Sequence, residues 1–267
     1  MYVVSNVNIF GGFMGFNNQL YGYIEDYYDP RDKIYRVHER PLSAIPDSVD
    51  LRSKWKFAVE QQGGQGSCAA NATASCTEYI LSTSDKYNSA EAPEISRSFL
   101  YYLARKEQGW QNRDSGSLLR DNIKVAAKYG VATEFCMPYN ENVFNKTPEQ
   151  ECLDEAARHK IGSYYRMSSL DEYIDCLAKG YPFVFGIYVY QDFMDGGNRG
   201  FIAMPSGKEL GAHAVVGCGY NKTYKYIIGR NSWGTRWGDG GYFYIPFDYM
   251  ISDSYLGDCW AVRDIKS

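Results

Sequence analysis

The feature of this sequence that most constrains its fold is a change of pattern near the middle of the chain. The first half carries helical periodicity in four segments, at residues 69–81, 96–107, 118–128 and 149–159. The second half carries β-rich runs, at residues 181–189, 212–218, 225–229 and 242–245. Helices followed by strands predict an α+β fold, with a helical lobe at about 51–160 and an antiparallel β lobe at about 161–267. Side chains of the two lobes would meet in a cleft between them.

The N-terminal residues 1–44 have a different character. They show little helical periodicity and many Gly, Asn, Asp and Tyr residues. Asp29-Pro30 and Arg40-Pro41 are typical of turns or extended segments. We therefore expect an arm that lies over a body formed by residues 45–267.

Composition argues against several functions. The chain of 267 residues has a net charge of −4 and no lysine/arginine run, so we expect no nucleic-acid or membrane partner. No stretch approaches the roughly 20 apolar residues that span a bilayer, and the first residues lack the basic segment of a secretory signal. The seven cysteines include no C-x-x-C pair, which predicts no disulfide scaffold, no metal site and no cofactor. These features favour an intracellular location.

One cysteine stands out by its surroundings. Cys68 follows the glycine-rich loop of residues 61–67 and stands at the start of the first predicted helix. The N–H groups and the dipole of a helix N-terminus favour negative charge, which biases a thiol there toward the nucleophilic thiolate. The small Gly66 and Ser67 leave the sulfur open to approach. A buried structural cysteine is the alternative explanation.

The three histidines limit the choice of a base for this thiol. His38 lies in the charged arm and His159 ends a polar helix, so we expect both at the surface. His213 begins an apolar strand among small residues, and Asn231 and Trp233 follow it after 18 and 20 residues. An asparagine carbonyl can accept the imidazole N–H and fix its tautomer, and an adjacent indole can screen that hydrogen bond from water. A hydrogen-bonded structural histidine is the alternative.

These residues make the chain resemble the papain-like cysteine peptidases over roughly residues 45–262. The resemblance rests on a glutamine six residues before Cys68, on Gly-Ala-His-Ala-Val around His213, and on Asn-Ser-Trp-Gly-x-x-Trp-Gly from Asn231. It implies a two-lobe enzyme that hydrolyses peptide bonds of peptides or proteins through a thioester. Cys68 would be the nucleophile, a thiolate paired with the imidazolium of His213. Asn231 would orient the imidazole, and Trp233 would shield their hydrogen bond.

The resemblance also implies residues that bind the oxyanion and the substrate. Gln62 would donate to the oxyanion with the Cys68 N–H, and Gln61 and Gln65 are rivals on spacing alone. Gly116 and Leu118 match the segment that binds the substrate backbone and lines the main apolar site. A loop that caps the third helix explains these two residues equally well.

The chain departs from the family pattern beside the nucleophile. Gln65 stands where a cysteine is usual and Ala69 where a tryptophan is usual, so we expect no disulfide at this loop. The local sequence around Cys68 resembles a branch of the family that has short prosegments and is known from bacteria and large viruses. This resemblance favours an intracellular or virion-associated location. The arm of residues 1–44 is too short for the usual helical propeptide. We interpret it as an intramolecular inhibitor that crosses the cleft, so that the chain is a self-inhibited precursor.

Three other interpretations stay open. An inactive protein of the same fold would bind peptides or a partner without cleaving them. The loop at residues 63–66 would cradle a phosphate, although it lacks the Gly-Lys-Ser/Thr ending of such loops. The same triad would also support acyl transfer to an amine instead of water.

Overall fold

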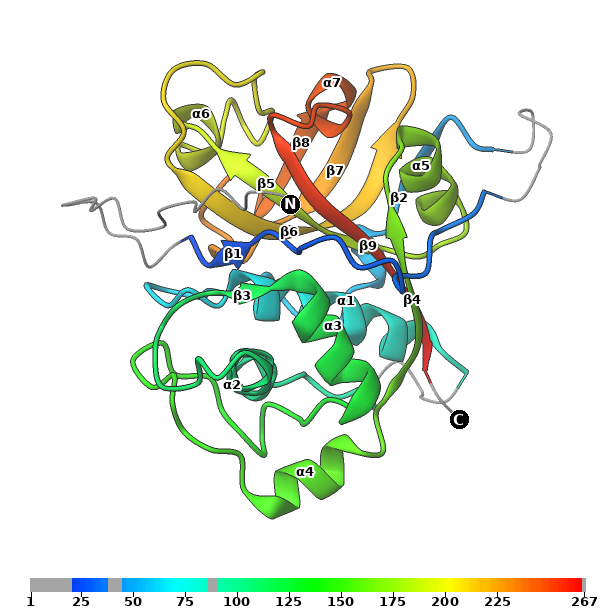
Figure 1. Ribbon diagram of the computed structural model, residues 1–267. Coiled ribbons are helices and arrows are strands. Elements are labelled where there is room, and N and C mark those ends of the chain that lie inside the picture. Colours follow the sequence, from blue (N-terminus) through cyan, green and yellow to red (C-terminus); the bar gives the residue numbers. More distant parts are fainter. Residues whose placement is uncertain (1–20, 38–44, 86–90, 266–267) are drawn as a thin grey trace, which may run out of the picture.

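The protein is described by a computed structural model, in which residues 21–37, 45–85 and 91–265 are placed. The helices of the first half of the chain gather on one side of the molecule and the antiparallel sheet, with shorter helices beside it, on the other (Figure 1). This arrangement confirms the predicted two-lobe α+β fold. Residues 1–20 and 38–44, which include His38 and much of the predicted arm, lie outside the described residues.

The helical lobe contains the four predicted helices, with small shifts at their ends. They are α1 (Cys68–Thr83), α2 (Arg97–Glu107), α3 (Leu119–Lys128) and α4 (Gln150–Ala156). The start of α2 is fixed by the Ser96 hydroxyl, which accepts a hydrogen bond from the Phe99 N–H at 3.1 Å. Gly130 follows α3 with a positive φ of 93°, a conformation that glycine adopts readily after a helix.

The β lobe is a seven-stranded sheet. Six strands follow the order β4-β9-β5-β6-β7-β8, and the seventh, β2, pairs with β6. All its pairings are antiparallel. The strands are β2 (Ser48–Asp50), β4 (Ile161–Met167), β5 (Phe183–Val189), β6 (Gly211–Asn221), β7 (Tyr226–Arg230), β8 (Tyr242–Pro246) and β9 (Leu256–Ile265). Shorter elements are η3 (Arg52–Lys54), α5 (Leu170–Ala178), α6 (Gln191–Met194) and α7 (Phe247–Met250).

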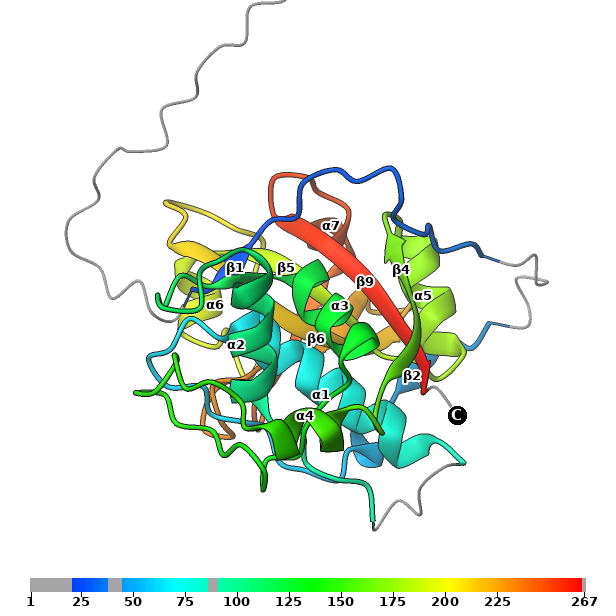
Figure 2. The ribbon, with the colours of Figure 1, turned by 60° about the horizontal axis from the view of Figure 1, so that its bottom comes forward.

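Helix α1 joins the two lobes. It is buried from Cys68 to Ser82 and packs against β6 on one side and against α2 and α3 on the other. Most of its residues are Ala, Ser or Thr, whose small side chains allow this close packing on all sides. Figure 2 shows α1 among α2, α3 and the strands of the sheet. The N-terminus of α1, and with it Cys68, therefore lies where the two lobes meet.

The described arm, residues 21–37, runs along the boundary between the lobes (Figure 1). Its strand β1 (Tyr23–Ile24) pairs in parallel with β3 (Ser117–Leu118) of the helical lobe. Farther along, the arm joins the sheet edge at β4, where the Tyr35 N–H donates to the Arg166 carbonyl at 2.8 Å. The side chains of Tyr23 and Tyr35 are buried against the body.

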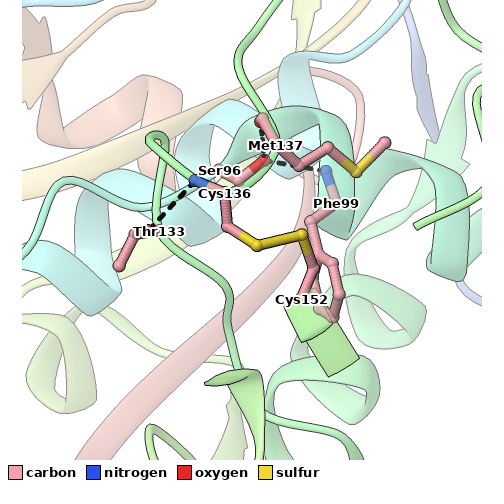
Figure 3. The surroundings of a disulfide bond; sticks show 6 residues. All are labelled: Ser96, Phe99, Thr133, Cys136, Met137 and Cys152. Atoms are coloured by element: carbon pink, nitrogen blue, oxygen red, sulfur yellow. Dashed lines mark hydrogen bonds between the residues drawn. A yellow bond between two sulfur atoms is a disulfide. The ribbon is translucent and has the colours of Figure 1, made fainter. Parts of the chain in front are cut away.

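Cys136 and Cys152 form a single disulfide, away from the Cys68 loop, that the cysteine spacing did not predict. The bond ties the start of α4 to the turn after Thr133, whose carbonyl accepts the Cys136 N–H at 3.1 Å. Figure 3 shows this turn against Ser96, whose hydroxyl donates to the Met137 carbonyl at 2.5 Å. The other five of the seven cysteines, Cys68 included, are reduced. The cysteine count therefore gave no indication of which two would pair.

We expect the double variant Cys136→Ser/Cys152→Ser to lower the free energy of unfolding by about 3 kcal/mol. A cross-link between residues 16 apart restricts the unfolded chain by roughly that amount. Urea unfolding of the oxidised protein, with and without reductant, measures it. Reductant should reproduce the loss in the wild-type chain and change nothing in the double variant. Equal stability of the reduced and oxidised wild-type chain would contradict this assignment.

Candidate active site

Cys68 is the first residue of α1, and its side chain has no exposed surface. Burial raises the pKa of its thiol to about 11, although the backbone N–H groups of Ala214 and Gly22 act in the opposite direction. Burial with the arm in place therefore opposes the thiolate that the helix N-terminus predicts. The cost of removing a negative sulfur from water outweighs the favourable helix terminus.

His213 lies on β6, beside α1, and is also fully buried. The N–H of the next residue, Ala214, interacts with the Cys68 sulfur, so the histidine and the thiol belong to one site. Burial lowers the pKa of His213 to about 4, against the hydrogen bond with Asn231, which raises it. In the arm-covered chain, burial thus favours the neutral form of both groups and opposes the expected thiolate–imidazolium pair.

Asn231 fixes the tautomer of His213. Its Oδ1 lies 2.7 Å from His213 Nε2, and the same oxygen accepts the Ser232 N–H at 2.8 Å. Because the Ser232 donor identifies that atom as the amide oxygen, His213 must carry its proton on Nε2. Nδ1, which is buried and has no hydrogen-bond partner in the described part of the chain, keeps its lone pair. The imidazole is thus prepared to accept a proton at Nδ1.

Trp233, the residue expected to shield the His213–Asn231 hydrogen bond, lies against this histidine. Its indole stacks on the imidazole with ring centroids 4.6 Å apart and an angle of 26° between the planes. Phe193 adds a second aromatic wall, with its ring edge-on to both His213 at 6.2 Å and Trp233 at 5.6 Å. The sequence analysis missed Phe193, because it comes from the short helix α6 and no local pattern marks it.

The three glutamines of the loop before Cys68 have different surroundings. The Gln62 side chain is fully buried; its Nε2 donates to the Gln65 carbonyl at 3.0 Å, and its Oε1 accepts the Ser232 hydroxyl at 2.7 Å. Gln65 donates its amide away from this site, to the carbonyls of Asn140 and Glu141. Gln61 is exposed. Of the three glutamines, Gln62 is the one whose side-chain amide joins the Cys68 loop to Ser232, the neighbour of Asn231.

Polar contacts hold the Cys68 loop where Gln65 replaces a cysteine. The Tyr139 hydroxyl donates to the Gln62 carbonyl and lies 2.7 Å from Ser67 Oγ, so it bridges both ends of the loop. The Asp114 carboxylate accepts the Gly66 N–H at 3.1 Å. The sequence analysis missed Tyr139 and did not give Asp114 this role, because the contacts cross 48 to 77 residues of chain.

The arm passes directly over this site. The Gly22 N–H interacts with the Cys68 sulfur, and the Gly22 carbonyl accepts the Ser117 N–H at 2.8 Å. The approach leaves no room for a side chain: a Cβ on Gly22 would lie 1.8 Å from the Gly66 carbonyl oxygen. Gly116, with a φ of 76°, is equally close, because its own Cβ would lie 2.3 Å from the Gly22 carbonyl oxygen. Leu118, the second residue of β3, is buried beside this pairing.

Residues from both lobes therefore form one buried constellation with a thiol, a base of fixed tautomer and backbone donors. Such a set suits nucleophilic acyl transfer. The described residues contain no group of three or more His, Cys, Asp or Glu side chains that could hold a metal ion. Within residues 21–37, 45–85 and 91–265, no helix is long and apolar enough to cross a membrane. His159, expected at the surface, is half-buried.

Comparison with known proteins supports this chemistry. Residues 45–253 match the family described as papain family cysteine protease. An uncharacterized peptidase C1-like protein of Acanthamoeba polyphaga mimivirus is 30% identical over 274 residues, which cover 92% of this chain and 87% of that protein.

Solved structures show the same likeness. Xylellain, a cysteine protease from Xylella fastidiosa, superposes with a TM-score of 0.86 and 33% identity, over 96% of this chain and all of that one. A procathepsin B from Trypanosoma congolense shares the fold, with a TM-score of 0.73 at 20% identity over 92% of this chain and 86% of its own.

Proposed function

Because this chain belongs to the papain family of cysteine proteases, we propose that it hydrolyses peptide bonds with Cys68 as nucleophile and His213 as base. The observation that carries the proposal is the fixed tautomer of His213 beside the thiol. The imidazole offers the lone pair of Nδ1, while Nε2–H is held by Asn231 at 2.7 Å.

The reaction would proceed in two acyl transfers. His213 Nδ1 takes the thiol proton, and the sulfur of Cys68 attacks the substrate carbonyl carbon to form a tetrahedral oxyanion. The Cys68 N–H and the Gln62 amide donate to that oxygen. The intermediate breaks down to a thioester as the imidazolium gives its proton to the leaving amine. Water, deprotonated by His213, then hydrolyses the thioester and restores the thiol.

We further propose that the arm inhibits this site in a precursor. At Gly22 the arm presents an N–H to the sulfur, and the Gly22 carbonyl accepts the Ser117 N–H at 2.8 Å, so the arm occupies the space over the thiol. The glycines at 22 and 116 permit this close approach. A substrate would replace the arm along the segment from Gly116 to Leu118 and use its backbone groups.

The role of Gln62 can be tested against its neighbour. We expect Gln62→Ala to lower kcat by about 10²- to 10³-fold with little change in KM, since it removes a donor that acts on the transition state. Gln61→Ala is the matched control and should stay within about threefold of the wild-type chain, because the Gln61 side chain is exposed to solvent. Steady-state kinetics on a fluorogenic peptide measure both variants. Equal losses in both, or a loss confined to KM, would contradict the assignment.

A buried charge cluster fastens the arm to the body. Asp26 of the arm accepts from Trp260 Nε1 at 2.8 Å and from the Arg120 N–H at 3.2 Å. Arg166 faces it at 3.8 Å and also pairs with Asp258 at 2.7 Å. Arg120 and Arg166 are shared with a further arm carboxylate, Asp32, at 2.8 Å and 3.5 Å. Burial and the neighbouring Asp258 charge raise the pKa of Asp26 to about 7, against the hydrogen bonds from Trp260 and Arg120.

This shift predicts that the arm docks more weakly as pH rises. Because the pKa of Asp26 is higher in the docked arm than in the free arm, docking takes up a proton. The favourable contribution of protonated Asp26 to the free energy of arm docking is complete below about pH 4. It is lost as pH rises through about 7. The measurement is the rate of Cys68 alkylation in the wild-type chain divided by that rate in Asp26→Asn. This ratio should rise at least about tenfold between pH 4 and pH 8. The ratio removes the thiol's own titration; a constant ratio would contradict the prediction.

A further inference from the structure

The residue after Gly22 is a tyrosine whose side chain packs into the β lobe. Tyr23 is 5% exposed, and its ring enters between β5 and β9 where both strands carry glycine. A Cβ on Gly186 would lie 2.3 Å from the Tyr23 ring, and one on Gly257 would lie 2.3 Å from its hydroxyl oxygen. Any larger residue at either position would fill the space. We name this space, formed by Gly186, Gly257 and Asp258, the tyrosine pocket.

The floor of the tyrosine pocket recognises a phenolic hydroxyl in both directions. The Tyr23 hydroxyl donates to Asp258 Oδ2 at 2.6 Å and accepts the Asp258 N–H at 2.8 Å. A phenylalanine ring would fill the same volume but would leave a buried acceptor and a buried donor unpaired. Such unpaired groups are the main means by which a site rejects an analogue that lacks a hydroxyl.

The pocket is also matched to a neutral group. Asp258 Oδ1 is paired with Arg166 at 2.7 Å, so its charge is already compensated. When the arm leaves, Asp258 Oδ2 loses two donors, the Tyr23 hydroxyl and the Asp26 N–H at 2.7 Å, while the Arg166 contact belongs to the body and persists. The emptied pocket thus offers one acceptor oxygen and one N–H, beside a fixed guanidinium that repels a second cation.

We propose that the tyrosine pocket selects the substrate, and that this peptidase prefers peptides with a tyrosine side chain within one or two residues of the scissile bond. The position follows from the arm itself, because Tyr23 is adjacent to the residue that covers Cys68. The inference rests on the proposed hydrolase function. It treats the arm as an occupant whose side chain the substrate replaces.

Hydrolysis of matched peptides tests this preference. In a Gly22→Ala background, in which the arm no longer fits over the thiol, we expect a tyrosine peptide to exceed its phenylalanine analogue by about 10- to 100-fold in kcat/KM. Its arginine analogue should be cleaved more slowly still. Adding Gly186→Ala should remove most of the tyrosine preference, because the new methyl group occupies the ring's place. Gly162→Ala, whose Cβ would be 3.3 Å from its nearest neighbour on the same sheet, is the matched control.

A second assay needs no peptide hydrolysis. In the full chain, Tyr23→Phe should speed alkylation of Cys68 by iodoacetamide about tenfold or more, since the arm loses its contact with Asp258. Tyr27→Phe is the control, because that ring of the same arm is 58% exposed. Equal kcat/KM for the tyrosine and phenylalanine peptides would overturn the inference but not the proposed peptidase function. Absence of any hydrolysis overturns the proposed function, and an unchanged alkylation rate in Tyr23→Phe then overturns the pocket as well.

Discussion

Cys68→Ala is expected to lower peptide hydrolysis by about 10⁴-fold or more, and His213→Ala by a similar factor. The two groups act as one unit, since the sulfur attacks only after the imidazole has taken its proton. The double variant should therefore be no slower than either single variant. Initial rates on a fluorogenic peptide at high enzyme concentration measure all three.

The matched control for this prediction is Cys76→Ala, on the same helix. Cys76 is buried like Cys68, but it lies eight residues farther along α1, where its thiol donates to the Pro182 carbonyl at 3.8 Å. It should keep nearly full activity and lose some stability. Additive losses in the Cys68/His213 double variant, or a comparable loss in Cys76→Ala, would show that these residues do not form a catalytic pair.

Gly22→Ala should raise the activity of the full chain by about tenfold or more. Its methyl group would lie 1.8 Å from the Gly66 carbonyl oxygen, and that oxygen belongs to the backbone of the nucleophile loop. Since the backbone cannot yield cheaply, the arm must move off Cys68. Without the desolvation that the arm imposes, the pKa of the thiol should fall from about 11, and the reactive ion pair should form with His213.

Arg31→Ala is the matched control in the same arm. Its guanidinium is exposed and pairs with Asp29 of the same turn at 2.7 Å, so the substitution should leave activity unchanged. Thermal melting should show that the body of the Gly22→Ala chain stays folded. Unchanged activity in a folded Gly22→Ala chain would contradict inhibition by the arm.

Much of the fold could be predicted because it is written in local patterns. The periodicities of residues 69–81 and 96–107 are local signals, and both helices formed within two residues of the expected bounds. Strands β4 and β9 were missed because they pair with each other across about 90 to 105 residues of chain, as between Met167 and Cys259 and between Ile161 and Ile265. Helix α5 did carry a local signal, the capping box of Ser169 and Glu172, which the sequence analysis overlooked.

The candidate site divides in the same way. The order of Cys68, His213 and Asn231 could be predicted because each lies in a recognisable motif. Their protonation states could not, because these depend on burial under an arm whose contact at Gly22 has no motif. The bridge made by Tyr139 across the Cys68 loop was equally invisible, since it joins segments that only the folded chain brings together.

The most direct test of this account is labelling with a peptidyl epoxide at pH 6, mapped by mass spectrometry in the wild-type and Gly22→Ala chains. The account predicts slow labelling of the wild-type chain and rapid, stoichiometric labelling of Gly22→Ala, at Cys68 alone. Adding His213→Ala should abolish it. No labelling in either chain, or equal labelling of several cysteines, would contradict an activated Cys68 and favour a peptide-binding protein without peptidase activity.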